Sequence, residues 1–178
     1  IRIPSSYSGC FGIKPTFGRI PAGPAPFVST STMVVMGPLT RCVRDAALYM
    51  DCTAGYHPAD PHSLPNPQAS YFLTIDDFPE KLKIAFSPDL GYAVVQKEIM
   101  FCVEKAVKAF EEMGHDVELW PGSLPDTGDV WGALIATDIY AQLCEVLEKE
   151  RERIGRTLVA VLDGTRDMTI DRFTASSS

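Results

Sequence analysis

The residues of this chain that could do chemistry are concentrated in its first stretch, IRIPSSYSGCFGIKPTFGR. Three hydroxyl residues, Ser5, Ser6 and Ser8, stand there among glycines, together with a thiol, a lysine and two arginines. Hydroxyl side chains at this spacing form hydrogen bonds to nearby backbone that hold tight turns. Glycine suits a backbone that approaches another group closely or adopts positive φ. The stretch therefore predicts a tightly turned, low-charge support beside a functional site.

The chain contains no complete catalytic set in its sequence. It has no readable Ser-His-Asp arrangement, no GxSxG turn and no phosphate-binding GxxxxGK[ST] loop. The histidines and cysteines lack the closely spaced pairs typical of zinc ligands. We therefore predict no metal and no cofactor. The residues considered for a metal are His57, His62, His115, Cys10, Cys42, Cys52, Cys102 and Cys144.

Composition indicates a globular protein and argues against several partners. With 46% hydrophobic and 22% charged residues, the 178-residue chain can bury a core. A net charge of −7 disfavours a nucleic-acid surface, which needs a basic face. No apolar run approaches the roughly 18 residues of a spanning helix, so we expect no membrane span. An odd number of scattered cysteines favours reduced thiols and a cytoplasmic location.

The elements that must position the first stretch are short and rich in proline and glycine. We expect extended pieces over residues 1–38, with a buried strand at Met33–Met36. A helix should follow, N-capped by Thr40 and stopped by Gly55. Within it, Arg41 and Asp45 are four residues apart, which favours an ion pair that supports the helix. The segment YHPADPHSLPNPQ then reads as a rigid loop.

The second half alternates strand and helix patterns. KLKIAFSP predicts a strand, residues 96–113 an amphipathic helix ended by Gly114, and HDVELWP a second strand. A crossover of this length favours a parallel β-α-β unit. Asp129 should cap a further helix. On it Trp131, Asp138 and Tyr140 could contribute to substrate choice, although for Asp138 we expect the more ordinary role of facing solvent. Residues 166–178 have little to pack and should fray.

Two blocks of the sequence resemble the amidase signature family. The first has the order xRxPxxxxGxxGxKPTxGR, and the family motif D-x-G-G-S-[IV]-R-x-P runs into a glycine-rich stretch ending in KPTxGR. The second, MGPLTRCVRDAALYMDCTAG, is similar to the family's GPM-x-R-[TS]-V-x-DAA block, and DPHSLP and KLKIAFSPDLGY fall where members have similar segments. The matching positions of the first block are Arg2, Pro4, Gly9, Gly12, Lys14, Pro15, Thr16, Gly18 and Arg19.

The resemblance implies an α/β fold: an α/β/α layered architecture around a mixed β-sheet, truncated here at both ends. We expect residues 1–178 to be one partial amidase domain. Its parts would be a signature core (1–60), a Pro-rich loop (61–80), a strand-helix-strand segment (81–122), a helical region (123–165) and a frayed tail (166–178). Open sheet edges in such a partial domain favour a homo-oligomer.

The resemblance also implies a reaction: hydrolysis of a carbon–nitrogen amide bond in a small molecule by a Ser-cisSer-Lys acyl-enzyme mechanism, without a cofactor. In the family pattern the nucleophilic serine would immediately precede Ile1, and the other two groups lie further upstream. Lys14 belongs to the KPT segment, and Ser5 and Ser6 lie beyond the nucleophile position. We therefore expect the isolated chain to be inactive. Two alternatives remain: an amidotransferase A-type subunit that releases ammonia from glutamine, and a non-catalytic scaffold or interaction module.

Three residues are candidates for supporting the nucleophile or binding substrate. Arg2 would orient the nucleophile loop or bind an anionic substrate, and a structural pairing with a buried acid fits its position as well. Tyr7 and Cys10 would line the acyl pocket, although simple core packing is the more ordinary role for both. No residue of this chain is predicted to be catalytic.

Overall fold

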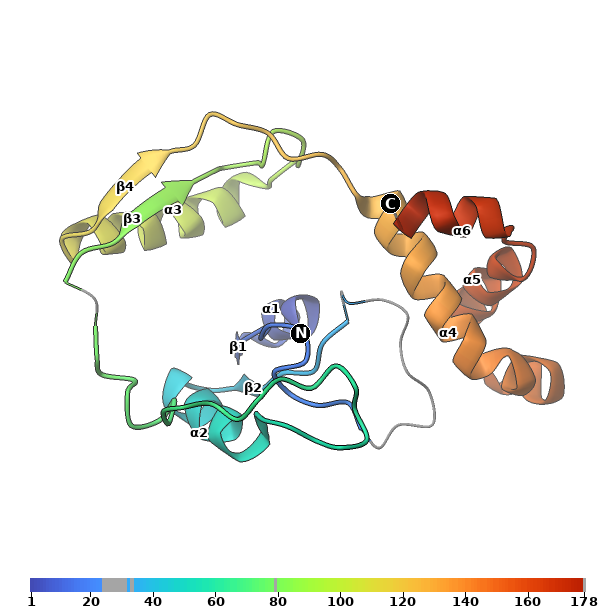
Figure 1. Cartoon of the computed structure of the whole chain (residues 1–178). Helices are drawn as coiled ribbons and strands as arrows, with labels where there is room; N and C mark the ends of the chain where they lie inside the picture. The colour runs from blue at the N-terminus through green and yellow to red at the C-terminus, as the bar shows by residue number, and fades with distance from the viewer. Residues whose placement is uncertain (24–31, 33, 79, 178) are drawn as a thin grey trace. The chain divides into compact units, whose positions relative to one another are not determined.

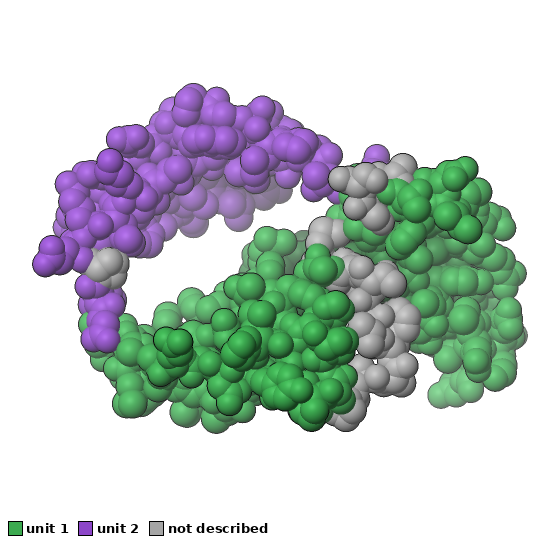
Figure 2. Space-filling view, viewed as in Figure 1, with its two compact units in different colours: residues 1–76, 130–178 green, residues 77–129 purple. Residues whose placement is uncertain are grey.

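The structure is a computed structural model that describes residues 1–23, 32, 34–78 and 80–177. It divides into two compact units (Figure 2). Unit 1 comprises Ile1–Asp76 and Val130–Ser178, and unit 2 comprises Asp77–Asp129. The expected single partial domain stays a prediction, and each unit is described by itself below.

Unit 1 begins with a helix where the sequence predicted extended backbone. Helix α1 spans Arg2–Ser8 and ends at Gly9, which adopts the left-handed conformation at φ 62° (Figure 1). Pro4 is tolerated because amides in the first turn of a helix have no intrahelical acceptor. The hydroxyl of Ser5 donates to the carbonyl of Ile1 at 2.7 Å, so the serine supports a helical turn. The predicted extended piece at residues 2–8 is therefore wrong.

Two short strands and one helix follow in unit 1. Strand β1 (Phe11–Gly12) pairs antiparallel with β2 (Leu39–Thr40), and helix α2 spans Val43–Thr53. The predicted buried strand is wrong over residues 34–36, which are irregular, with Val34 48% exposed; Met33 lies outside the described residues. The backbone pairs with another strand further along the chain, at Leu39–Thr40, where β1 is the partner. Helix α2 has the predicted location and buries Ala46, Ala47 and Met50.

The start of α2 differs from the sequence-based expectation. Its N-cap is Cys42, without a side-chain cap hydrogen bond, while Thr40 instead donates to the carbonyl of Cys42. Arg41 consequently precedes the helix, and among the described residues no ion pair joins it to Asp45. An i,i+4 pair requires both residues on the helix, so that expectation is wrong.

Unit 2 confirms the predicted strand-helix-strand unit. Strand β3 (Lys83–Phe86) pairs in parallel with β4 (Asp116–Leu119), and helix α3 (Lys97–Glu112) connects them (Figure 1). Gly114, at φ 91°, follows the helix as expected. The apolar stripe of α3 nevertheless remains partly open, because no residue of the helix is fully buried and Ile99 is 54% exposed.

The C-terminal part of unit 1 is helical. Helix α4 (Gly128–Glu150) leads through a 3₁₀ turn (Arg151–Arg153) into α5 (Arg156–Arg166), which returns along α4 (Figure 1). Leu147 of α4 and Leu162 of α5 are fully buried. Ion pairs from Arg151 to Asp163 and from Arg166 to Glu148 close the turn between the two helices.

The predicted frayed tail is wrong, because helix α6 spans Ile170–Ser177. Met168, just before it, is fixed to α4 through its sulfur, which accepts a hydrogen bond from the hydroxyl of Thr137 at 3.3 Å. The helix therefore starts two residues after a contact with α4.

The expectation that no segment could span a membrane also needs correction. Within the described residues, Gly128–Arg153 is long and apolar enough to cross a membrane by length and composition alone, with a mean hydropathy of 1.3. Small residues such as Ala133 and Ala136 extend its apolar character between the larger side chains. Such a helix is weak support for a membrane location, because core helices have the same composition.

Leu162 provides a test of this helical packing. Leu162→Ala should lower the free energy of unfolding by about 2–4 kcal/mol, because the residue is fully buried and truncation leaves a cavity. The matched control is Val161→Ala on the same helix, where the side chain is 41% exposed and the change should be below about 1 kcal/mol. Urea unfolding measures both, and equal losses would contradict the assigned packing.

Candidate functional site

The first residues of the chain are packed closely against β1 and the segment before β2. A Cβ placed on Gly12 would lie 2.0 Å from the hydroxyl oxygen of Ser5. A Cβ on Gly37 would lie 2.3 Å from the carbonyl oxygen of Ile13 and 2.7 Å from Cδ1 of Ile1. These glycines therefore allow the backbone to approach Ile1 more closely than any side chain would permit.

The three candidate residues from the sequence do not converge on one point. Arg2 and Tyr7 are exposed on α1, and Tyr7 is 91% exposed. Cys10 is half-buried, and its thiol lies 3.6 Å from the carbonyl oxygen of Ser8. In the described structure none of the three lines the cavity of unit 1. Their roles at the nucleophile or substrate stay predictions.

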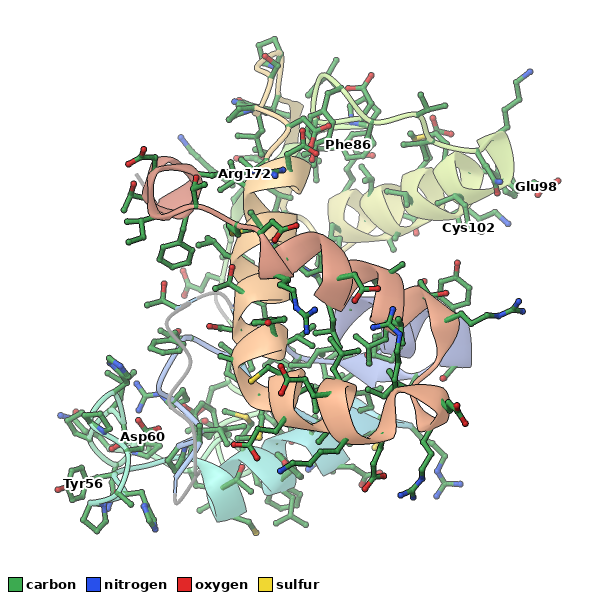
Figure 3. All side chains as sticks on the ribbon, turned by 90° about the vertical axis from the view of Figure 1, so that its right-hand side faces the viewer. Tyr56, Asp60, Phe86, Glu98, Cys102 and Arg172 are labelled. Carbon is green, nitrogen blue, oxygen red and sulfur yellow. The ribbon has the colours of Figure 1, made fainter. Side chains whose placement is uncertain are left out.

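A buried carboxylate joins the glycine-rich segment to the Pro-rich loop. Asp60, which is 8% exposed, lies on the loop that also carries Tyr56 (Figure 3). Its Oδ2 accepts the backbone N–H of Ala22 at 2.8 Å, and its Oδ1 accepts that of His62 at 2.9 Å. These two hydrogen bonds, followed by the charges of His62 and His57, hold the pKa of Asp60 below its ordinary value of 3.8.

Two further hydrogen bonds, at Gly18 and Arg19, reinforce this connection. The N–H of Leu64 donates to the carbonyl of Gly18 at 2.9 Å, and the guanidinium of Arg19 donates to the carbonyl of Pro65 at 3.0 Å. A Cβ on Gly18 would lie 2.0 Å from the carbonyl oxygen of His62, and the glycine has φ 76°. We name these contacts, together with those of Asp60, the cross-brace between residues 16–23 and 55–65.

A cavity of about 320 Å³ opens beside the cross-brace within unit 1. Apolar side chains form most of its lining, and Asp60, His62, Thr16 and Gln142 contribute polar groups. The ring of His62 lies 5.4 Å from the ring of Phe17, centroid to centroid. The apolar lining residues include Phe17, Ile20, Val34, Val35 and Met36. A cavity with this lining suits a small, mainly apolar group that carries few polar atoms.

Sequence reasoning placed DPHSLP in the family pattern but did not identify Asp60 as a buried hydrogen-bond acceptor. The available signal was an acidic residue between two prolines, Pro58 and Pro61, in a loop of low charge. The expectation for Asp138 is wrong: the residue is 4% exposed and lies within α4, so it is buried. Its neighbour Thr137 donates to the sulfur of Met168, so the segment before α6 contacts α4 next to this position.

The described residues contain no group of three His, Cys, Asp or Glu side chains that could hold a metal ion. All five cysteines are free.

Comparison with known proteins places this arrangement in a family. Residues 1–172 match the sequence profile of the Amidase family. The acylamidase of Rhodococcus erythropolis is 33% identical over 158 residues, which cover 86% of this chain and 32% of the acylamidase. The A-type subunit of the glutamyl-tRNA(Gln) amidotransferase of Macrococcus caseolyticus is 35% identical over 119 residues, which cover 66% of this chain and 24% of that protein. The chain belongs to the amidase family.

The fold supports this membership. A bacterial aryl acylamidase of the amidase signature family superimposes with a TM-score of 0.75 at 26% identity, covering 98% of this chain and 38% of the solved one. The predicted amidase signature α/β fold is therefore confirmed. This amidase chain spans about a third of the length of the acylamidase that it matches.

Asp60 gives a pH-dependent test of the cross-brace. Because its pKa is lowered in the folded state, the carboxylate stabilises the fold above pH 3.8, and the contribution disappears as the pH falls through the lowered value. Asp60→Asn should cost about 1 kcal/mol at pH 7, since one of the two part-buried N–H groups loses its charged acceptor. Urea unfolding from pH 7 to pH 2.5 should show the two proteins converging. A difference that stays constant with pH would contradict the role of the charge.

Proposed function

We propose that this chain is part of an amide hydrolase that cleaves carbon–nitrogen bonds through a serine acyl-enzyme. The observation that carries the proposal is the match of residues 1–172 to the Amidase family, with an acylamidase related over 86% of the chain. The role of this chain in the reaction is to position groups that precede Ile1 in the family pattern. No cofactor is required by this chemistry.

The packing of Ile1 supports this positioning role. Ser5 donates both its backbone N–H, at 3.0 Å, and its hydroxyl, at 2.7 Å, to the carbonyl of Ile1. The side chain of Ile1 rests against Gly37 and Gly12, where no larger residue fits. A serine attached to Ile1 would therefore be held by a backbone that cannot shift without breaking these contacts. Accurate placement of a nucleophile is a large part of its catalytic effect.

The extent of the related sequences favours an amidase over the amidotransferase. The acylamidase aligns over 158 residues, whereas the amidotransferase protein aligns over 119. The longer alignment includes more of the chain outside the signature blocks, where substrate choice differs among enzymes that share a catalytic core. A non-catalytic scaffold and an amidotransferase A-type subunit remain the alternatives.

Activity distinguishes these alternatives. The 178-residue chain alone should show no turnover of 4-nitroacetanilide, because the predicted triad lies outside it. A longer protein that carries the family's upstream segment should hydrolyse the anilide and should lose activity with phenylmethylsulfonyl fluoride. Turnover by the 178-residue chain, abolished by the same reagent, would contradict the missing triad. A longer protein whose glutaminase activity requires a partner protein would favour the amidotransferase.

We further propose that the cavity of unit 1 holds an apolar group of the amide substrate. Its lining includes Thr16 and Met36, which are the chain neighbours of Pro15 and Gly37. Gly37 in turn packs against the side chain of Ile1 and against Pro15. The cavity wall is thus one residue away, along the chain, from the atoms that hold Ile1. An acyl or amine group of moderate size would fit there.

Filling the cavity should change substrate preference in the longer, active protein. Val35→Trp should lower kcat/KM for 4-nitroacetanilide at least about tenfold relative to that for acetamide, because the larger side chain occupies the space of the ring. Val161→Trp, on the exposed side of α5, is the control and should leave the ratio unchanged. An unaltered ratio in Val35→Trp would contradict the cavity assignment, whereas absence of turnover in the parent protein would contradict the proposed function itself.

We propose a small-molecule amide as the partner, without nucleic acid or membrane, and a cytoplasmic location. In this proposal other parts of the enzyme cover the apolar surface of α4. The burial of Asp138 and the ion pair that joins α5 to α4 support it. A homo-oligomer stays part of the proposal.

A further inference from the structure

The last segment of unit 1 before unit 2 forms a single helical turn that begins at Ser70. The backbone N–H and the hydroxyl of Thr74 both donate to the carbonyl of Ser70, at 3.2 Å and 2.8 Å. The hydroxyl of Ser70 accepts the N–H of Leu73 at 3.1 Å. Unit 1 ends six residues later at Asp76. A turn this short is not stable by itself, because forming a helical nucleus costs more than its few hydrogen bonds return.

Asp51, on helix α2, supplies the hydrogen-bond acceptor that the first amides of this turn lack. Its carboxylate accepts the hydroxyl of Ser70 at 2.5 Å and the backbone N–H groups of Tyr71 at 2.6 Å and Phe72 at 3.1 Å. The first amides of a helical turn have no acceptor within the turn, and a carboxylate is their strongest partner. A residue on a different helix therefore caps the turn. The same contacts, the Ser70 hydroxyl first, lower the pKa of Asp51.

Arg44 makes a second contact with the same segment. It precedes Asp51 by seven residues on α2, a spacing of two helical turns that places both side chains on one face. Its guanidinium lies 2.9 Å from Oδ2 and 3.2 Å from Oδ1 of Asp76, and 5.5 Å from the centre of the Phe72 ring. One face of α2 thus holds the segment near its beginning and at its end.

We propose that Asp51 and Arg44 form a two-point anchor that fixes residues 70–76 on α2 and so sets the position from which the chain leaves unit 1. Release of the anchor frees the connection between the units while α2 itself remains folded. Asp51 is the stronger of the two points, because hydrogen bonds from several donors to one carboxylate exceed the small contribution of an exposed ion pair.

Amide hydrogen exchange of the 178-residue chain tests the anchor directly. In Asp51→Ala the amides of Tyr71 and Phe72 should exchange at least about fivefold faster, while those of α2 keep their protection. Alanine has the highest helix propensity, so this substitution does not weaken α2. Arg44→Gln should produce a smaller increase over residues 72–76. Asp45→Ala is the matched control: Asp45 is another exposed aspartate of α2, and the described structure gives it no hydrogen bond to residues 70–76.

Two results would overturn the proposal. The first is unchanged protection of Tyr71 and Phe72 in Asp51→Ala, or an equal change in Asp45→Ala. The second is a loss of protection that extends equally over α2, because residues 70–76 would then open only together with that helix. If Asp51→Ala does not fold, Asp51→Asn replaces it, because it keeps the size of the side chain while it removes the charge and one of the two acceptor oxygens. The same local increase supports the anchor, and unchanged exchange overturns it.

Discussion

The structure of unit 1 depends on the hydrogen bonds of one buried carboxylate. Asp60, which is 8% exposed, accepts the N–H of His62 from its own loop and that of Ala22, 38 residues before it in sequence. Gly18 makes the close approach of the same segments possible, because a Cβ there would meet the carbonyl of His62. Short strands and one-turn elements surround this point, so the local stability of the region comes from the cross-brace rather than from extended secondary structure.

The cross-brace and the environment of Ile1 belong to one continuous arrangement. Residues 16–23 are fixed on one side by the loop at 55–65, and Pro15, the preceding residue, packs against Gly37, which also packs against Ile1. A rigid framework of this kind suits an enzyme in which the reacting groups must be held accurately.

Unit 2, by contrast, leaves much of its apolar surface open. Its two parallel strands have few neighbours among the described residues, and helix α3 leaves large apolar side chains such as Phe101 and Phe110 partly open. Parallel strands are ordinarily buried on both faces within larger sheets. The strands and the apolar stripe of α3 thus present more apolar surface than unit 2 buries by itself.

The local sequence was sufficient to predict the family, the position of α2, and the strand-helix-strand unit with its parallel pairing. These follow from glycine and proline at fixed spacing and from apolar periodicity over 16 residues in α3, which are local properties. The remaining features depend on tertiary contacts. Arg2–Ser8 is helical although its sequence is rich in serine and contains proline, and Ile1 before it packs against Gly37, which is distant in sequence. Ile170–Ser177 is helical rather than frayed, and Met168 just before it contacts Thr137 of α4. Asp138 is buried within α4, and Asp60 is buried where Ala22, 38 residues before it, donates to its carboxylate. No local pattern encodes which distant segments will meet.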